Sequence, residues 1–134
     1  MDLIKLLIAN RGEVAIRIIR GAEELGLQTA TIFSEDDAGS PHVSRADEAH
    51  ALIGVGATAY LDIEQVITTA KTSGSDAVHP GYGFLAESAE LARRCAEEGI
   101  AFVGPSIEAL ELFGDKSRAR NLAQEQDVPV LLGS

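Results

Sequence analysis

Apolar residues along this chain fall into two patterns, short continuous runs and longer stretches with helical spacing. Residues 3–9 are apolar except for Lys5, which is typical of a strand buried in a parallel sheet. Residues 13–25 carry apolar side chains every three or four positions and are followed by Gly26, a residue that commonly ends helices. Residues 29–33 form a second apolar run, so the chain opens with a strand–helix–strand unit whose crossover should be right-handed.

The same alternation of strands and helices continues to the end of the chain, which predicts an α/β fold. The expected strands lie near residues 47–53, 76–79 and 100–103. The expected helices lie at 41–46, from Asp62 to Gly74, from Ser88 to about residue 98, from Ser106, and at about 115–125. A last apolar run, 128–132, is the start of a strand with no later strand to pair with, so we expect the chain to be one domain of a longer protein.

The composition indicates one globular domain and makes some classes of binding partner unfavourable. The chain has 134 residues, of which 46% are hydrophobic and only 4% aromatic, so its core must be aliphatic. Its net charge of −10 disfavours nucleic acid or an anionic membrane surface as a partner. The single cysteine, Cys95, rules out a disulfide framework within the chain, which fits a reducing cytoplasm and the role of a small helix residue.

Residues 79–87, with the sequence HPGYGFLAE, are the stretch most suggestive of a site. They follow a predicted strand, and ligands of open α/β sheets bind at the carboxyl ends of the strands. Two glycines and a proline give the loop an unusual backbone, with Tyr82 between the glycines and Phe84 after them. An equally simple interpretation is a turn whose aromatic side chains cap the core.

Other candidate sites are weaker. The turn after the first strand contains Gly12 but lacks the three glycines of a dinucleotide-binding loop, and Glu13 stands where a phosphate would bind. The acidic segment 34–40 lacks the spacing of a calcium loop, and we interpret it as a solvated loop. His42 and His50 have no ligand partners at metal-binding spacing and are expected to be surface residues.

Seven short segments form a recognisable set: IANRGEVA at residues 8–15, RI at 17–18, HV with ADE at 42–48, YL at 60–61, HPGYGFLAE at 79–87, FVGP at 102–105 and GDK at 114–116. Their order and spacing hold over essentially the whole chain, and together they resemble the amino-terminal domain of biotin carboxylase. The resemblance implies a Rossmann-like, three-layer α/β domain of the pre-ATP-grasp type with a mainly parallel sheet. It also implies an ATP-dependent ligase in which ATP and bicarbonate carboxylate N1 of carrier-bound biotin.

On this resemblance, residues 1–134 are the amino-terminal domain, and the ATP-grasp and carboxyl-terminal domains, with the Mg ligands, follow it. The isolated chain is then not expected to catalyse the reaction. The implied partners are a biotin carboxyl carrier protein or domain, a carboxyltransferase and a second copy in a homodimer, whose interface Arg20 and Glu24 match. The alternatives are a stand-alone, non-catalytic binding module, or the first domain of another ATP-grasp ligase such as carbamoyl-phosphate synthetase.

The resemblance assigns binding roles to four further residues, and no catalytic or metal-binding role to any. Lys116 matches the family lysine that reaches the ATP phosphates, although a first-turn surface lysine is the plain alternative. Tyr82 and Gly83 match the wall of the carboxylation site near biotin. Glu87 matches the acid in that loop, and it also fits a helix amino terminus, where its charge complements the helix dipole.

Overall fold

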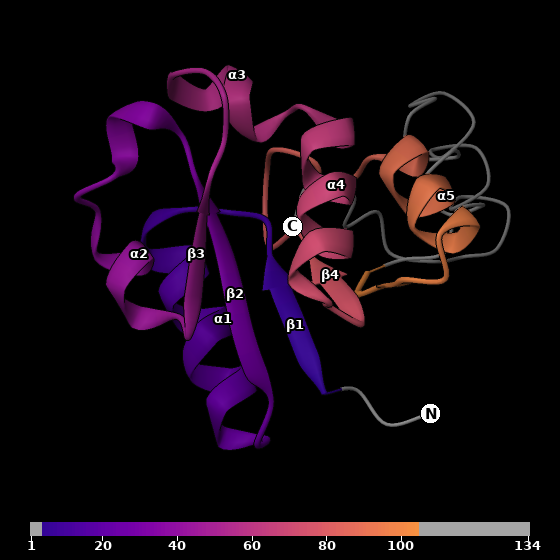
Figure 1. Ribbon diagram of the computed structural model, residues 1–134, viewed down its shortest axis with the longest axis horizontal. Coiled ribbons are helices and arrows are strands. Elements are labelled where there is room, and N and C mark those ends of the chain that lie inside the picture. The colour runs from indigo at the N-terminus through magenta and orange to yellow at the C-terminus, as the bar shows by residue number, and fades with distance from the viewer. Residues whose placement is uncertain (1–3, 105–134) are drawn as a thin grey trace, which may run out of the picture.

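The computed structural model describes residues 4–104, which form a five-stranded parallel sheet in the order β3-β2-β1-β4-β5 (Figure 1). The strands are β1 (Lys5–Ile8), β2 (Gln28–Phe33), β3 (Glu48–Ala51), β4 (Ala77–His79) and β5 (Ala101–Phe102). Every paired neighbour in the sheet is parallel. The predicted α/β class with a parallel sheet is confirmed, whereas the elements predicted beyond residue 104 lie outside the described residues.

Five helices and one short turn connect the strands. The helices are α1 (Gly12–Glu24), α2 (Pro41–Arg45), α3 (Gly56–Tyr60), α4 (Ile63–Ser73) and α5 (Ala89–Glu97), and the 3-10 turn is η1 (Glu35–Asp37). The predicted helix starts at Asp62 and Ser88 are confirmed. Each side chain caps its helix: Asp62 accepts a hydrogen bond from the Gln65 amide, and Ser88 accepts one from the Leu91 amide. The sequence pattern did not predict α3, whose five residues are too short for a periodic signal.

The alternating side chains of β1 divide the interior into two cores, one on each face of the sheet. Leu6 and Ile8 pack with apolar residues of α1, whereas Leu7 and Ala9 pack with residues of α4 and α5. Figure 1 shows α1 behind the sheet and α4 and α5 in front of it, which gives the three expected layers. Complete burial of a side chain such as Leu7 contributes about 1.5–3 kcal/mol.

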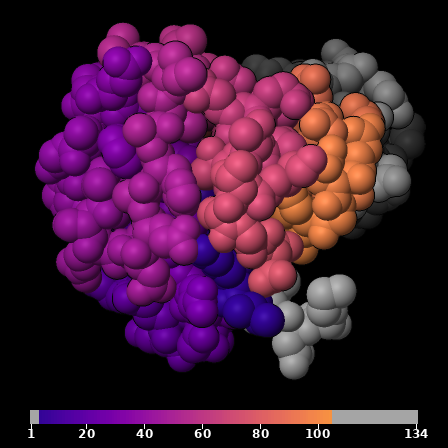
Figure 2. Space-filling model, in the orientation of Figure 1, coloured from indigo at the N-terminus to yellow at the C-terminus, as the bar shows by residue number. Residues whose placement is uncertain are grey.

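Helices α4 and α5 pack on the same face of the sheet, and Figure 2 shows their residues side by side at the surface. The Arg94 guanidinium of α5 forms two hydrogen bonds with the Glu64 carboxylate of α4, at 2.9 and 3.0 Å. Lys71 and Glu98 add an ion pair at 2.9 Å. Each pair joins a partly buried side chain, Arg94 or Glu98, to a more exposed one, Glu64 or Lys71, so we expect each to contribute only modestly to stability. No helix within residues 4–104 has the length and apolar character needed to cross a membrane.

Most of the acidic segment 34–40 is exposed, as its composition predicts, but Asp37 within it is buried. Asp37 is only 7% exposed, and its carboxylate accepts hydrogen bonds from Arg11 Nε at 2.6 Å and from the Tyr60 hydroxyl at 2.6 Å. The Arg11 guanidinium beside it holds the pKa of Asp37 well below its usual range. The burial of Asp37 could not be predicted, because both partners are distant in sequence and only the fold brings them to the acid.

His42 is also not the surface residue that its spacing suggested. Its side chain is completely buried, with Nε2 3.0 Å from the Ile32 carbonyl oxygen. Burial lowers the pKa of His42, so the imidazole is neutral at pH 7. His50 is only half-buried, with its Nε2 3.1 Å from a Glu48 carboxylate oxygen.

Candidate functional site

The candidate site lies where the chain changes direction across the sheet. From β1 the chain winds through α1 to β2 and β3 on one side, whereas β4 leads through α5 to β5 on the other. The carboxyl ends of the adjacent strands β1 and β4 are therefore the topological switch point, which is where open α/β sheets bind their ligands. Asn10 follows β1 at this point, and the loop of residues 79–87 follows β4.

The side chain of Asn10 joins the two strand ends. Asn10 is only 2% exposed, and its Nδ2 donates hydrogen bonds to the Pro80 carbonyl at 2.7 Å and to the Tyr82 carbonyl at 2.8 Å. Its Oδ1 accepts a hydrogen bond from the Arg11 amide at 2.8 Å. The amide fills the space between β1 and the loop, which supports the earlier argument against a pyrophosphate-binding turn here.

The loop backbone requires its glycines for different reasons. Gly81 has φ of 69°, and a Cβ there would lie 2.7 Å from Asn10 Nδ2 and 2.8 Å from Val14 Cγ1. Gly83 has φ of 71°, but a Cβ there would have nothing within 4 Å. The Gly81 amide also donates to His79 Nδ1 at 3.1 Å. Gly81 thus provides both conformation and close packing, whereas Gly83 provides conformation alone.

The two aromatic side chains of the loop have different environments. The Phe84 ring packs against the main core, 5.2 Å from the ring of Tyr60 between centroids. Tyr82 is 81% exposed. Phe84 therefore agrees with the interpretation of a turn that caps the core, while Tyr82 does not, because an exposed phenol on an anchored loop contributes little to folding.

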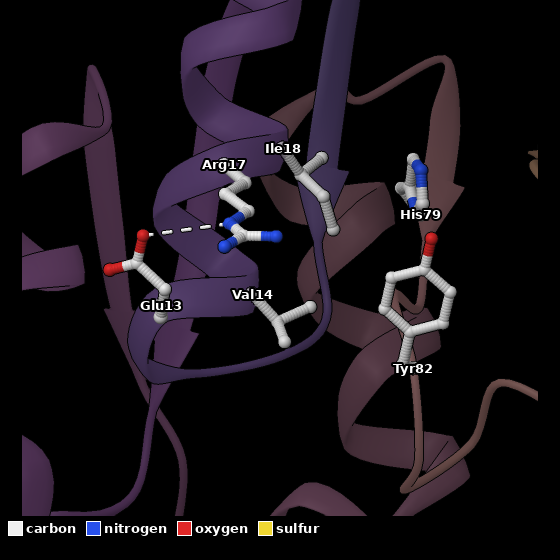
Figure 3. Close-up of a pocket in the computed structure, with 6 residues that line it drawn as sticks. All are labelled: Glu13, Val14, Arg17, Ile18, His79 and Tyr82. Atoms are coloured by element: carbon white, nitrogen blue, oxygen red, sulfur yellow. Dashed lines mark ion pairs between the residues drawn. The ribbon is translucent and has the colours of Figure 1, made fainter.

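A cavity of about 420 Å³ lies between the loop and α1 (Figure 3). Tyr82 and His79 line it from the β4 side, and α1 contributes two apolar side chains and an ion pair between Arg17 Nε and Glu13 Oε1 at 3.6 Å. Burial lowers the pKa of His79, so its ring is neutral at pH 7 and can accept the Gly81 hydrogen bond. The cavity lining combines apolar side chains with a few polar groups, as small-molecule sites do.

A second, apolar hollow of about 310 Å³ adjoins this cavity and shares Ile18 and His79 with it. It lies between α1 and the β4–β5 side of the sheet and is rimmed by Leu25, which is 79% exposed. Its other apolar lining residues are Leu6, Ala22, Leu27 and Val103. Apolar surface of this kind at the edge of a core is typical of a face on which another element packs.

The structure places the predicted site residues on two separate surfaces. Tyr82 lines the cavity, while Gly83 and Glu87 are exposed on the same loop. Arg20 and Glu24 are exposed on α1 and line neither hollow. Lys116 lies outside the described residues. Within residues 4–104, no three His, Cys, Asp or Glu side chains are grouped to hold a metal ion.

Sequence reasoning did not assign functional roles to Asn10, Arg17 and His79. Asn10 and His79 had a detectable signal, since each is a polar residue at the carboxyl end of an apolar strand run. Arg17 had no comparable signal, because a charged residue on an amphipathic helix is ordinarily a solvated one.

Comparison with known proteins agrees with this arrangement. The sequence profile described as "Biotin carboxylase, N-terminal domain" matches residues 2–110. Pyruvate carboxylase of Bacillus subtilis (strain 168) is 53% identical over 133 residues, covering 97% of this chain and 12% of that protein.

Two solved structures extend the likeness to the fold. The biotin carboxylase domain of a single-chain bacterial carboxylase is 57% identical, with a TM-score of 0.90 over 95% of this chain and 30% of its own. The biotin carboxylase domain dimer of 2-oxoglutarate carboxylase from Hydrogenobacter thermophilus, solved with MgADP, ADP and bicarbonate, is 43% identical, with a TM-score of 0.91 over 96% of this chain and 28% of its own. This chain therefore spans less than a third of each of these proteins, and it belongs to the family of biotin carboxylase N-terminal domains.

Proposed function

We propose that this chain is the first domain of a biotin-dependent carboxylase that uses ATP and bicarbonate to carboxylate N1 of carrier-bound biotin. The observation that carries the proposal is the anchored loop 79–87, which presents an exposed Tyr82 at the switch point of a sheet whose chain belongs to this family. ATP supplies the phosphoryl group that activates bicarbonate. The loop of residues 79–87 binds and orients biotin in this reaction.

In this proposal, Tyr82 and Gly83 form one wall of the carboxylation site. The phenol offers biotin a flat apolar surface with a polar tip, and the open space beside Gly83 lets a ligand approach the backbone closely. Glu87 is exposed at the end of the loop, where its carboxylate can pair with a cation from a later domain. Lys116 is proposed to contact the ATP phosphates, as an ammonium group on a long side chain can.

The rest of the proposed enzyme follows this domain in the same polypeptide. The lengths of the relatives support this, since the chain spans only 12% to 30% of the length of the relatives described above. The apolar hollow beside Leu25 supports it as well, because a following domain would cover that surface. We further propose a cytoplasmic homodimer with Arg20 and Glu24 at its interface, Mg held by the later domains, and a biotin carrier and a carboxyltransferase as partners.

The experiment that tests the proposal uses the complete polypeptide that contains this chain. Transfer of labelled bicarbonate carbon to free biotin is measured with ATP and Mg²⁺ present. We expect transfer that depends on both bicarbonate and biotin, and a raised KM for biotin in the Tyr82→Ala variant. Ile53→Ala is the matched control, because Ile53 is also exposed, at 83%, but follows the edge strand β3, at the other side of the sheet.

The other outcomes of this experiment identify the alternatives. ATP cleavage stimulated by ammonia and not by biotin would indicate another ATP-grasp ligase, such as one of the carbamoyl-phosphate synthetase type. A complete polypeptide that neither binds nor cleaves ATP would indicate a non-catalytic binding module. For the chain of residues 1–134 alone, we expect weak or undetectable ATP binding in a calorimetric titration, and tight binding would contradict our placement of the ATP site.

A further inference from the structure

The side-chain amide of Asn10 is buried, and its nitrogen binds only the loop of residues 79–87. Both of its N–H donors bind carbonyls of the loop, those of Pro80 and Tyr82, and its oxygen accepts the Arg11 amide. Burying an amide costs free energy unless its hydrogen bonds are made, so a residue needed only to fill the space would be apolar. The amide at this position is therefore best explained by its hydrogen bonds to the loop.

The two carbonyls that Asn10 binds lie on either side of Gly81. Asn10 Nδ2 lies 2.7 Å from the Pro80 carbonyl oxygen and 2.8 Å from the Tyr82 carbonyl oxygen. These two hydrogen bonds hold the backbone between the two carbonyls, at Gly81 and Tyr82, in one position. The absence of a side chain at Gly81 lets the amide approach this closely. Since Tyr82 is 81% exposed, the backbone position from which its side chain extends depends on this restraint more than on packing of the phenol.

We propose that Asn10 is a positioning residue for the carboxylation of biotin, whose amide holds the Pro80 and Tyr82 carbonyls so that Tyr82 and Gly83 face the biotin ring. This inference rests on the proposed function. Asn10 itself contacts neither biotin nor ATP in this scheme. Its effect passes through the loop, and it should alter the use of biotin without altering the activation of bicarbonate.

The sharpest variant is Asn10→Asp, which keeps the shape of the side chain and the acceptor for the Arg11 amide. It replaces the donating nitrogen with a carboxylate oxygen, which would face two carbonyl oxygens and repel them. In the complete polypeptide we expect the KM for free biotin to rise on the order of 10- to 100-fold, as misplacement of a site by about 1 Å can cause. ATP cleavage that depends on bicarbonate alone should stay within about twofold of the parent, since the loop takes no part in that step.

The matched control is Thr29→Val, which removes a buried hydrogen bond of similar kind far from the loop. Thr29 is completely buried near the amino end of β2, and its Oγ1 accepts the Asp47 amide at 3.0 Å. This variant should also be destabilised, because the Asp47 amide loses its acceptor, but should keep the biotin KM of the parent. A rise in KM in both variants would assign the effect to general loss of stability and would overturn the proposal.

A second measurement tests the positioning without relying on catalysis. Hydrogen–deuterium exchange of the 134-residue chain should be faster at the Gly81 amide, which donates to His79 Nδ1, in Asn10→Asp than in the parent, with exchange in α5 unchanged. Unchanged exchange in the loop would overturn the positioning role whatever the enzyme does. Faster loop exchange in a protein that never carboxylates biotin would instead confirm the restraint and refute the proposed function on which the catalytic role rests.

Discussion

Substituting Gly81 with alanine tests whether the loop is held as closely against β1 and α1 as the structure indicates. An alanine Cβ would lie 2.7 Å from Asn10 Nδ2 and 2.8 Å from Val14 Cγ1, both shorter than normal side-chain contacts. The Asn10 nitrogen cannot move away without losing its hydrogen bonds to the loop, and Val14 is part of α1. The backbone must shift instead.

The expected loss of stability has two parts. The left-handed φ of 69° costs an alanine about 1–2 kcal/mol. Forcing a methyl group into a filled space adds about 1–3 kcal/mol. Gly81→Ala should therefore lower the free energy of unfolding by about 2–5 kcal/mol. Gly83→Ala is the matched control, since its φ of 71° carries the same conformational cost but its Cβ would have nothing within 4 Å.

The assay is urea denaturation of the parent chain and both variants, followed by circular dichroism. Gly83→Ala should lower the free energy of unfolding by about 1–2 kcal/mol, so the difference between the variants isolates the close contact. If Gly81→Ala were no more destabilising than Gly83→Ala, the packing of the loop against Asn10 described above would be incorrect.

Three further predictions concern buried titratable groups. Asp37→Asn should lower the stability at pH 7 by about 1–3 kcal/mol, because Arg11 and Tyr60 lose a charged partner. Since the folded pKa of Asp37 is below its usual 3.8, the parent's advantage over this variant in urea denaturation should shrink as the pH falls below about 3.8. His42, whose pKa is lowered by burial from 6.5, contributes stability that is complete above about pH 6.5 and falls below it, so His42→Gln should flatten the dependence of Tm on pH in that range. Burial raises the pKa of Cys95 to about 11, so iodoacetamide at pH 8 should alkylate the folded chain at least ~100-fold more slowly than the chain in urea, as mass spectrometry can measure. The burial of Asp37 would be contradicted if the stability difference between the parent and Asp37→Asn did not change with pH. The burial of His42 would be contradicted if His42→Gln left the dependence of Tm on pH unchanged, and that of Cys95 if the folded chain were alkylated as fast as the chain in urea.

Most of the fold could be predicted from local pattern. Apolar runs give buried parallel strands, and residues such as Asp62 and Ser88 mark helix starts because their side chains bond the free amides there. The environments of Asp37 and His42 could not be predicted in this way. Each of them contacts groups that are close only after the strands have paired, and a polar residue has no local signal for burial.

The sequence by itself determined the family, the order of elements and the loop that presents Tyr82, because these follow from motifs and from periodicity along the chain. It also indicated that Gly81 and Gly83 give this loop a special backbone, although it could not distinguish their roles. Tertiary structure decided the rest. The sheet order places β1 beside β4, and this alone brings Asn10 within hydrogen-bond distance of a loop seventy residues later. Hydrogen bonds and close packing act over a few ångströms in space, so a site built from them is defined only when the strands have taken their places in the sheet.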